Sequence, residues 1–201
     1  MQANKNLQTA IFIDRDGTIN EDTGYVSSPD ELIVYPCAAE AVRLVNESGM
    51  KAIVITNQSG IARSLYTEQT LGAIHDRLTR ELARCGARID GIYYCPHHPD
   101  FGDETYRKRC ECRKPRPGML IDAARDHQID LAASYVIGDK ASDINLAAEV
   151  GARGALVLTG YGRETLRRRD RWPCEPVIVA DDLLEAVKQI LDRERVSDVR
   201  C

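Results

Sequence analysis

Residues 10–18 read AIFIDRDGT, a short apolar run that ends abruptly in two aspartates and a glycine. Residues 10–13 have the length and the unbroken apolarity of a strand that is buried on both faces of a parallel sheet. Asp14 and Asp16 follow at the carboxyl end of this strand, which is where open α/β sheets bind their ligands. Gly17 allows a tight turn directly afterwards. The stretch therefore predicts a parallel α/β sheet with an acidic site at one edge.

Five more short apolar runs alternate with segments of helical periodicity. The further strands are predicted at residues 52–55, 92–94, 135–137, 155–158 and 177–179, and the helices at about 38–48, 67–85, 117–127, 142–150 and 181–192. Parallel strands joined through helices need right-handed crossovers. We therefore predict an α/β fold, a doubly wound, three-layer, Rossmann-like parallel sheet in a single domain over residues 1–201.

Composition excludes several classes of protein. The 27 basic and 31 acidic residues give a net charge of −4, which offers no general attraction for nucleic acid. No segment approaches the roughly 20 apolar residues of a membrane span, and the first residues lack the pattern of a signal peptide. We expect a cytoplasmic enzyme with no membrane partner. The isolated cysteines are then expected to be plain thiols: Cys37, Cys85, Cys174 and Cys201.

Polar side chains follow the other predicted strands as well. Thr56 and the residues Asn57, Gln58 and Ser59 come after the second strand, and Asp139 with Lys140 comes after the fourth. A carboxylate can attack phosphorus while a second one protonates the leaving group. A third carboxylate would complete an oxygen-rich Mg²⁺ site, and a hydroxyl with a lysine such as Lys114 would surround the phosphoryl oxygens. The set predicts phosphoryl transfer with an aspartate nucleophile.

Two residues near this site keep two interpretations. Lys140 is either a contact to phosphate or carboxylate, which we favour, or a solvated side chain. Asp143 is either another carboxylate of the metal site or the cap of the helix that it opens, and capping is slightly favoured.

Residues 94–114 read YCPHHPDFGDETYRKRCECRK and contain three cysteines and two histidines. Two close pairs of possible metal ligands lie across this loop. The first is Cys95 with a histidine two or three residues later, and the second is Cys110 with Cys112. Such a Cys₃His set is typical of a closed, structural zinc site. The spacing alone does not choose between His97 and His98.

The same loop is basic, so a nucleic-acid-binding zinc module is the alternative from another class. Arg113 and Lys114 follow Cys112 directly, however, so the zinc would hold these two cations over the acidic site. A second basic stretch, Arg163 with Arg167–Arg169 and Arg171, is interpreted as a solvated face.

Four motifs in order, DRDGT, TNQ, RKP and GDK, resemble those of the haloacid dehalogenase superfamily of aspartate-nucleophile phosphatases. The spacings leave no room for a separate cap domain. Within that superfamily FIDRDGTIN, TNQSGIAR, DGIYYCPHHP and CRKPRPGML resemble the zinc-containing D-glycero-D-manno-heptose 1,7-bisphosphate 7-phosphatases. The related histidinol-phosphate phosphatases, the alternative, have a shorter zinc loop and usually TNQDG. Residues 163–201 match only weakly.

The resemblance implies a role for each motif. Asp14 is the nucleophile, Asp16 the acid and base, and Thr56, Arg113 and Lys114 complete the catalytic set. Catalytic Mg²⁺ is bound by Asp14, the Asp16 backbone carbonyl and Asp139, and structural Zn²⁺ by Cys95, His97, Cys110 and Cys112. The expected substrate-binding residues are Asp14, Arg15, Asp16, Asp22, Thr23, Gly24, Tyr25, Thr56, Asn57, Gln58, Ser59, Arg113, Lys114 and Lys140.

The resemblance also implies a small sugar bisphosphate as the only partner of a monomeric enzyme. Its product, heptose 1-phosphate, would feed nucleotide-activated heptose for cell-surface glycans. The preferred anomer of the 1-phosphate stays open at this point.

Overall fold

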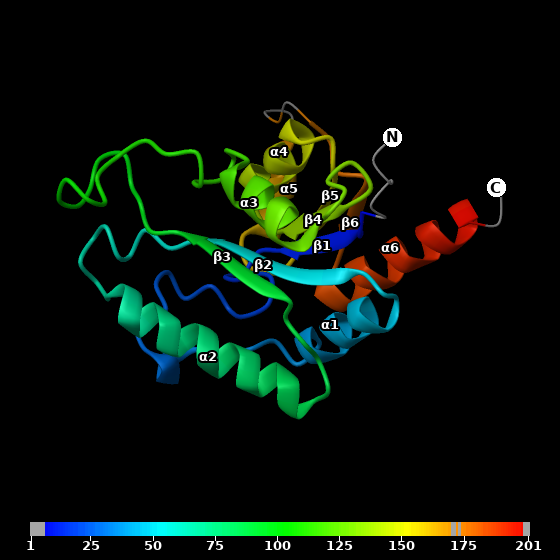
Figure 1. The fold of residues 1–201 in the computed structure, drawn as a ribbon, viewed down its shortest axis with the longest axis horizontal. Coiled ribbons are helices and arrows are strands. Elements are labelled where there is room, and N and C mark those ends of the chain that lie inside the picture. The colour runs from blue at the N-terminus through cyan, green and yellow to red at the C-terminus, as the bar shows by residue number, and fades with distance from the viewer. Residues whose placement is uncertain (1–6, 170–171, 173, 199–201) are drawn as a thin grey trace, which may run out of the picture.

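The structure is a computed structural model that describes residues 7–169, 172 and 174–198 (Figure 1). Arg171 and Cys201, for which the sequence predicted a solvated side chain and a plain thiol, lie outside the described residues.

One sheet of six parallel strands forms the centre of the fold, in the order β3-β2-β1-β4-β5-β6. In β1, Ile11 pairs with Ala52 of β2 on one side and with Tyr135 of β4 on the other. The order reverses between β1 and β4, as in a doubly wound sheet, so the sequence prediction is confirmed. The strands are β1 (Ala10–Ile13), β2 (Lys51–Asn57), β3 (Gly91–Cys95), β4 (Tyr135–Gly138), β5 (Arg153–Val157) and β6 (Ile178–Ala180).

Helices cover both faces of the sheet (Figure 1). One layer contains α1 (Ala38–Glu47), α2 (Glu68–Arg84) and α6 (Leu183–Asp198), and the opposite layer contains α3 (Gly118–His127) and α4 (Ala141–Glu149). The chain adds a short η1 (Pro29–Glu31) and α5 (Gly162–Arg167). Arg163 and Arg167–Arg169 are exposed, as predicted for a solvated face, although most of this stretch is helical. α6 extends past the predicted end at residue 192.

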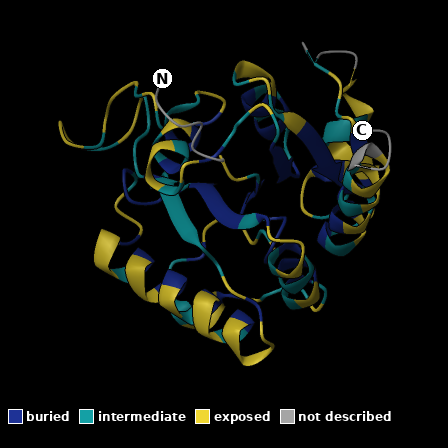
Figure 2. Cartoon of the chain, turned by 45° about the vertical axis from the view of Figure 1, so that its right-hand side comes forward, coloured by how far each residue is buried: buried dark blue, intermediate teal, exposed yellow. Residues whose placement is uncertain are grey.

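The core consists of two apolar clusters, one on each face of the sheet. Alternate side chains of β1 point to opposite faces, so Ile11 and Ile13 pack toward α1 and α6 while Phe12 packs toward α3 and α4. Figure 2 shows the central strands buried and the outer face of α2 exposed. The edge strands are less well covered than predicted, and Val179 of β6 is exposed.

The helix ends follow the expected chemistry. The Thr67 hydroxyl accepts a hydrogen bond from the Thr70 backbone N–H at 3.1 Å, which caps α2. Gly49 and Gly86, after α1 and α2, have φ angles of 84° and 75°, the left-handed conformation that glycine adopts at little cost.

α2 also buries one polar side chain, His75, which is 8% exposed. The Arg15 guanidinium donates to His75 Nε2 at 3.2 Å, so the neutral ring carries its proton on Nδ1. Burial, together with the positive charge of Arg15, lowers the pKa of His75 to about 3. His75 is thus a core residue whose buried ring nitrogen has a hydrogen-bond partner.

We expect this histidine to make the fold acid-sensitive. The unfolded chain binds a proton at His75 below about pH 6.5, whereas the folded chain binds it only near pH 3, so stability falls as the pH drops through that window. From pH 7 to pH 5 the loss from this one residue is about 2 kcal/mol. Urea unfolding of His75→Gln, which keeps an acceptor for Arg15, should show a weaker pH dependence than wild type. Parallel curves for the two proteins would contradict the assignment.

Candidate active site and metal cluster

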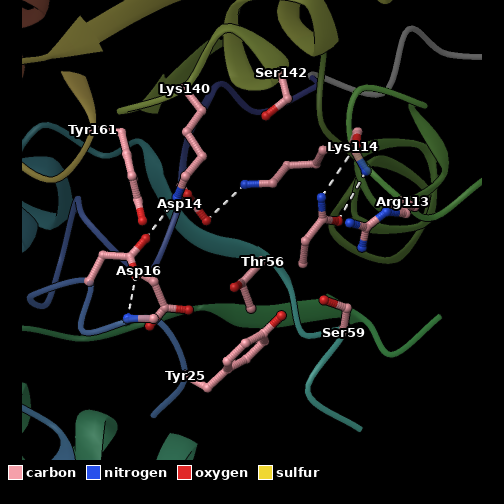
Figure 3. Close-up of a pocket in the computed structure, with 13 residues that line it drawn as sticks. Asp14, Asp16, Tyr25, Thr56, Ser59, Arg113, Lys114, Lys140, Ser142 and Tyr161 are labelled. Carbon is pink, nitrogen blue, oxygen red and sulfur yellow. Dashed lines mark hydrogen bonds and ion pairs between the residues drawn. The ribbon is translucent and has the colours of Figure 1, made fainter. Parts of the chain in front are cut away.

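A pocket of about 500 Å³ opens at the carboxyl ends of β1, β2 and β4, beside the point where the strand order reverses (Figure 3). This is the position expected for a ligand site in a doubly wound sheet. Its lining residues are Asp14, Asp16, Asp22, Gly24, Tyr25, Thr56, Asn57, Ser59, Arg113, Lys114, Lys140, Ser142 and Tyr161.

Asp14, directly after β1, is buried and paired with a buried lysine. Lys114 Nζ lies 2.7 Å from Asp14 Oδ1, and the Arg15 backbone N–H donates to the same oxygen at 2.8 Å. Among the described residues every polar contact of this carboxylate falls on Oδ1, so Oδ2 is left for the pocket. Burial raises the pKa of Asp14 to about 6, although the Lys114 ammonium counteracts the rise. Asp14 is therefore ionised at neutral pH.

Three buried carboxylates lie together at this edge, with ligand oxygens of Asp14, Asp139 and Asp143 all within 4.8 Å of one another. Burial raises the pKa of Asp139 to about 7, and the nearby charge of Asp14 adds to the rise. Asp139 Oδ1 is buried and accepts no hydrogen bond in the described chain, and its one ion-pair partner there is Lys140 Nζ at 3.4 Å. Carboxylates crowded in this way need a cation, and an oxygen-rich set of this kind suits Mg²⁺.

Two glycines make room for Asp139. Gly17 has a φ angle of 90°, and a Cβ atom there would lie 2.3 Å from Asp139 Oδ2. A Cβ atom on Gly160 would approach the same oxygen equally closely. Gly17 was predicted as a turn residue from the sequence, whereas the need for glycine at position 160 depends on its approach to Asp139, which follows another strand.

Asp143 combines the roles between which the sequence left a choice. Its Oδ2 accepts from the Lys140 backbone N–H at 3.2 Å, which caps α4. Its Oδ1 lies 2.6 Å from Lys114 Nζ, so it also shares the buried lysine with Asp14. Asp143 therefore belongs to the carboxylate cluster as well as to the helix cap.

Asp16 is held away from Asp14 by several donors. The Arg15 guanidinium donates to both of its oxygens, at 2.9–3.0 Å, and Asn20 Nδ2 donates at 3.0 Å. Gln58 Nε2 adds a fifth hydrogen bond, at 2.8 Å. Burial alone would raise the pKa of Asp16, but the Arg15 charge and these hydrogen bonds outweigh burial and lower it. Asp16 is therefore an anchored anion at the floor of the pocket.

Three expected substrate-binding residues are not brought to the pocket surface. The Arg15 side chain is fully buried between Asp16 and His75, and Gln58 is 2% exposed behind Thr56. Thr23 is exposed but does not line the pocket. The sequence placed Arg15 and Gln58 at the right strand ends and could not give the direction of their side chains.

Asn57 holds the loop that carries Lys114. Its Oδ1 accepts from the Lys114 backbone N–H at 3.1 Å, and its Nδ2 donates to the Lys114 carbonyl at 3.3 Å. The guanidinium of Arg113 beside it donates to the His97 carbonyl at 3.2 Å, the one hydrogen bond of this side chain in the described part of the protein. Both cations of this loop reach the pocket (Figure 3).

The far wall of the pocket contains Lys140 and Tyr161. Lys140 Nζ lies 2.9 Å from Asp22 Oδ2 and 3.4 Å from Asp139 Oδ1, so the contact to carboxylates that the sequence favoured is present. The same ammonium is 4.9 Å from the centre of the Tyr161 ring. Tyr161 and Ser142 also line the pocket and were not predicted from the sequence, although Tyr161 follows β5 and could have been expected at a strand end.

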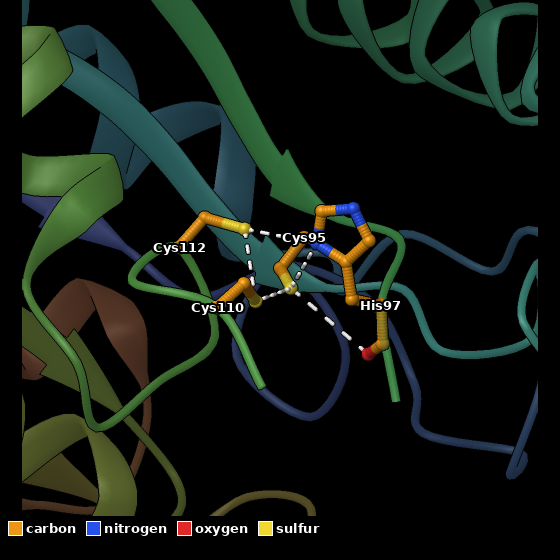
Figure 4. A group of neighbouring side chains, drawn as sticks. All are labelled: Cys95, His97, Cys110 and Cys112. Carbon is orange, nitrogen blue, oxygen red and sulfur yellow. Dashed lines mark hydrogen bonds between the residues drawn. The ribbon is translucent and has the colours of Figure 1, made fainter. Parts of the chain in front are cut away.

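A second cluster lies in the loop after β3, where three cysteines and one histidine face a common point (Figure 4). Cys110 Sγ is 3.5 Å from Cys95 Sγ and 3.3 Å from Cys112 Sγ, and His97 Nδ1 is 3.3 Å from Cys112 Sγ. Ligands of a tetrahedral zinc ion, at about 2.0–2.3 Å from the metal, have similar separations. His98 is turned away, with its Nδ1 accepting from the Asp100 backbone. The ring in the cluster is therefore that of His97.

Comparison with known proteins agrees with this geometry. A family model described as HAD-hydrolase-like matches residues 111–186. D-glycero-beta-D-manno-heptose-1,7-bisphosphate 7-phosphatase of Photorhabdus laumondii is 46% identical over 153 residues, 75% of this chain and 81% of the relative. The enzyme of that name from Bordetella bronchiseptica is 41% identical over 182 residues, covering 90% and 97% of the two chains.

The fold of this chain also resembles that of a solved phosphatase structure. A crystal structure of the D,D-heptose 1,7-bisphosphate phosphatase from B. bronchiseptica, in complex with magnesium and phosphate, superposes with a TM-score of 0.83. It is 41% identical in sequence, and the match covers 92% of this chain and 99% of that one. In the described part of the chain, no helix has the length and apolarity to cross a membrane. Fold, site and relatives agree that this chain belongs to the D-glycero-D-manno-heptose-1,7-bisphosphate 7-phosphatase family of haloacid dehalogenase-like phosphatases.

Proposed function

We propose that this protein hydrolyses the 7-phosphate of D-glycero-D-manno-heptose 1,7-bisphosphate in a Mg²⁺-dependent reaction. The observation that carries the proposal is the ionised Asp14, buried beside Lys114 with one oxygen free toward the pocket. The relatives are named for the heptose reaction, which supports this substrate over histidinol phosphate.

In the first step Asp14 Oδ2 attacks phosphorus and the bond to the sugar oxygen breaks, which leaves an aspartyl phosphate. Asp16 is an anion in the free site, so it must take up a proton from solvent as substrate enters before it can give that proton to the departing oxygen. In the second step a water attacks the aspartyl phosphate, and Asp16 takes a proton from that water. Phosphate leaves and Asp14 is restored, so one slow hydrolysis is divided into two easier steps.

The charges around Asp14 suit a phosphoryl group. Lys114 and the Thr56 hydroxyl are placed to contact its oxygens. Asp14, Asp139 and the Asp16 backbone carbonyl would hold Mg²⁺, and Asp143 lies in the same carboxylate cluster. When bound, the metal ion supplies positive charge that offsets the charge on the phosphoryl oxygens.

Arg113 is the residue best placed for the second phosphate of a bisphosphate. Lys114 and Lys140 are already paired with carboxylates, whereas the Arg113 guanidinium donates only to a carbonyl. A guanidinium can bind phosphate through two parallel hydrogen bonds. The site thus has an inner lysine for the transferred group and an outer arginine for the other end of the substrate.

We infer that the four-residue cluster binds structural zinc. It occupies both ends of the loop that ends in Arg113 and Lys114, and its four ligands leave no open position for catalysis. Zinc would therefore support catalysis by fixing these two cations. A nucleic-acid role for this loop does not account for the buried carboxylates beside it.

Phosphate release tests the proposal directly. With Mg²⁺, wild type should release one phosphate from either anomer of heptose 1,7-bisphosphate faster than from histidinol phosphate, and chelation of Mg²⁺ should stop the reaction. Asp14→Asn should lower kcat by at least ~10³-fold because the amide cannot attack, while circular dichroism shows an intact fold. Residual activity within tenfold of wild type would rule out the nucleophile.

The zinc assignment predicts the metal content of the purified protein. Wild type should contain about one zinc per chain, and Cys110→Ser should lose it because serine is a poor zinc ligand. Cys85→Ser is the matched control, since Cys85 is exposed and outside the cluster. Mass spectrometry of the metal gives the answer, and unchanged zinc in Cys110→Ser would remove that residue from the ligand set.

The role of Arg113 predicts a loss that depends on the substrate. Arg113→Ala should lower kcat/KM for heptose 1,7-bisphosphate by about 10–100-fold, because a charge-assisted pair to phosphate is lost. For heptose 7-phosphate, which lacks the second phosphate, the change should stay within about threefold. Equal losses on the two substrates would show that Arg113 acts on the transferred phosphate instead.

A further inference from the structure

Gln58 lies directly behind the pocket and uses both ends of its amide. It is 2% exposed, and Nε2 donates to Asp16 Oδ2 at 2.8 Å and to Thr56 Oγ1 at 2.7 Å. Its Oε1 accepts from Arg15 at 3.2 Å and from the Tyr66 hydroxyl at 2.6 Å. The NH₂ group of Gln58 therefore donates two hydrogen bonds, and its carbonyl oxygen accepts two.

The orientation of the amide is fixed by its neighbours. A guanidinium only donates hydrogen bonds, so the end that faces Arg15 must be the oxygen. Asp16, bound to that same guanidinium, is a carboxylate and only accepts, so the end that faces it must be the NH₂ group. A flipped amide would place its NH₂ group against the Arg15 guanidinium, which only donates, and its oxygen against the Asp16 carboxylate, which only accepts.

This orientation decides what the Thr56 hydroxyl can do. Thr56 Oγ1 accepts from Gln58, and a hydroxyl has a single proton to donate. Among the described residues Gln58 is its one side-chain hydrogen-bond partner, and Thr56 lines the pocket. Its proton is therefore left for an acceptor that enters the pocket.

We propose that Gln58 is a positioning residue that keeps the Thr56 hydroxyl a donor toward the transferred phosphoryl group. The inference rests on the proposed function, because that function supplies the phosphoryl oxygens that accept this proton. A hydroxyl whose proton already points into the pocket does not have to reorient when negative charge develops on the phosphoryl oxygens. The chain of contacts runs from His75 on α2 through Arg15 to Gln58 and Thr56.

Two substitutions separate this role from simple support. Gln58→Glu keeps the shape and the acceptor for Arg15 and Tyr66, but it presents a second acceptor to Thr56, whose proton then turns away from the pocket. Gln58→Met loses all four hydrogen bonds and leaves the proton free. We expect Gln58→Glu to lower kcat by about 10–100-fold and to weaken orthovanadate binding by at least ~10-fold.

Gln58→Met loses the donor that sets the Thr56 proton but presents no competing acceptor, so we expect a smaller loss than in Gln58→Glu, of about 5–10-fold in both measurements, even where thermal unfolding shows that it is the less stable variant. A supporting role predicts the reverse order, with the methionine variant worse because it loses more contacts. That reverse order would overturn the inference. Tyr66→Phe, which removes one contact on the acceptor side and leaves Arg15 in place, should bind vanadate within about twofold of wild type.

A double-variant cycle tests whether the effect passes through Thr56. In Thr56→Val the hydroxyl is absent, so adding Gln58→Glu should change vanadate affinity by less than about threefold. Additive losses would show that Gln58 acts elsewhere, for example only on Asp16. Calorimetry with orthovanadate needs no sugar substrate. An inactive wild type would therefore refute the proposed function while the vanadate results still decide the role of Gln58.

Discussion

The site depends on one buried ammonium, that of Lys114, held between the carboxylates of Asp14 and Asp143. Removal of one partner from such a buried pair leaves a charge without compensation and costs about 3–5 kcal/mol. The end of β1, the start of α4 and the loop before α3 must therefore converge on one point. Apolar residues of similar volume would stabilise the same contact equally well. The charges are thus better explained by phosphate chemistry than by stability.

Lys114 itself lies on no helix or strand, so its position needs other support. Asn57 binds its backbone from both sides, and Cys112 ties the chain two residues earlier to the cysteine and histidine cluster. Tyr94 and Tyr106 donate to the two oxygens of Glu68, which joins the same loop to the start of α2. Each contact removes freedom that a long irregular loop would otherwise keep.

The sequence predicted most of the fold and the centre of the site for a physical reason. Parallel strands align their carboxyl ends, so residues that follow strands, such as Asp14, Thr56 and Asp139, were expected to meet. The directions of Arg15 and Gln58 were not predictable, because they depend on His75 and Tyr66, which approach from distant segments. The short α5 was also missed, since a six-residue segment with three charged residues and one large apolar one gives no periodic signal.

The cations in the pocket and directly behind it are of two kinds. Arg15, Lys114 and Lys140 each face carboxylates of the protein, so they hold the groups that react and leave little free positive charge. Arg113, at the outer wall, donates only to a backbone carbonyl within the described chain. Because a carbonyl neutralises no charge, this guanidinium attracts an anion at the rim. Under the proposed function, selection among sugar phosphates would then belong to the outer wall, and bond breaking to the inner one.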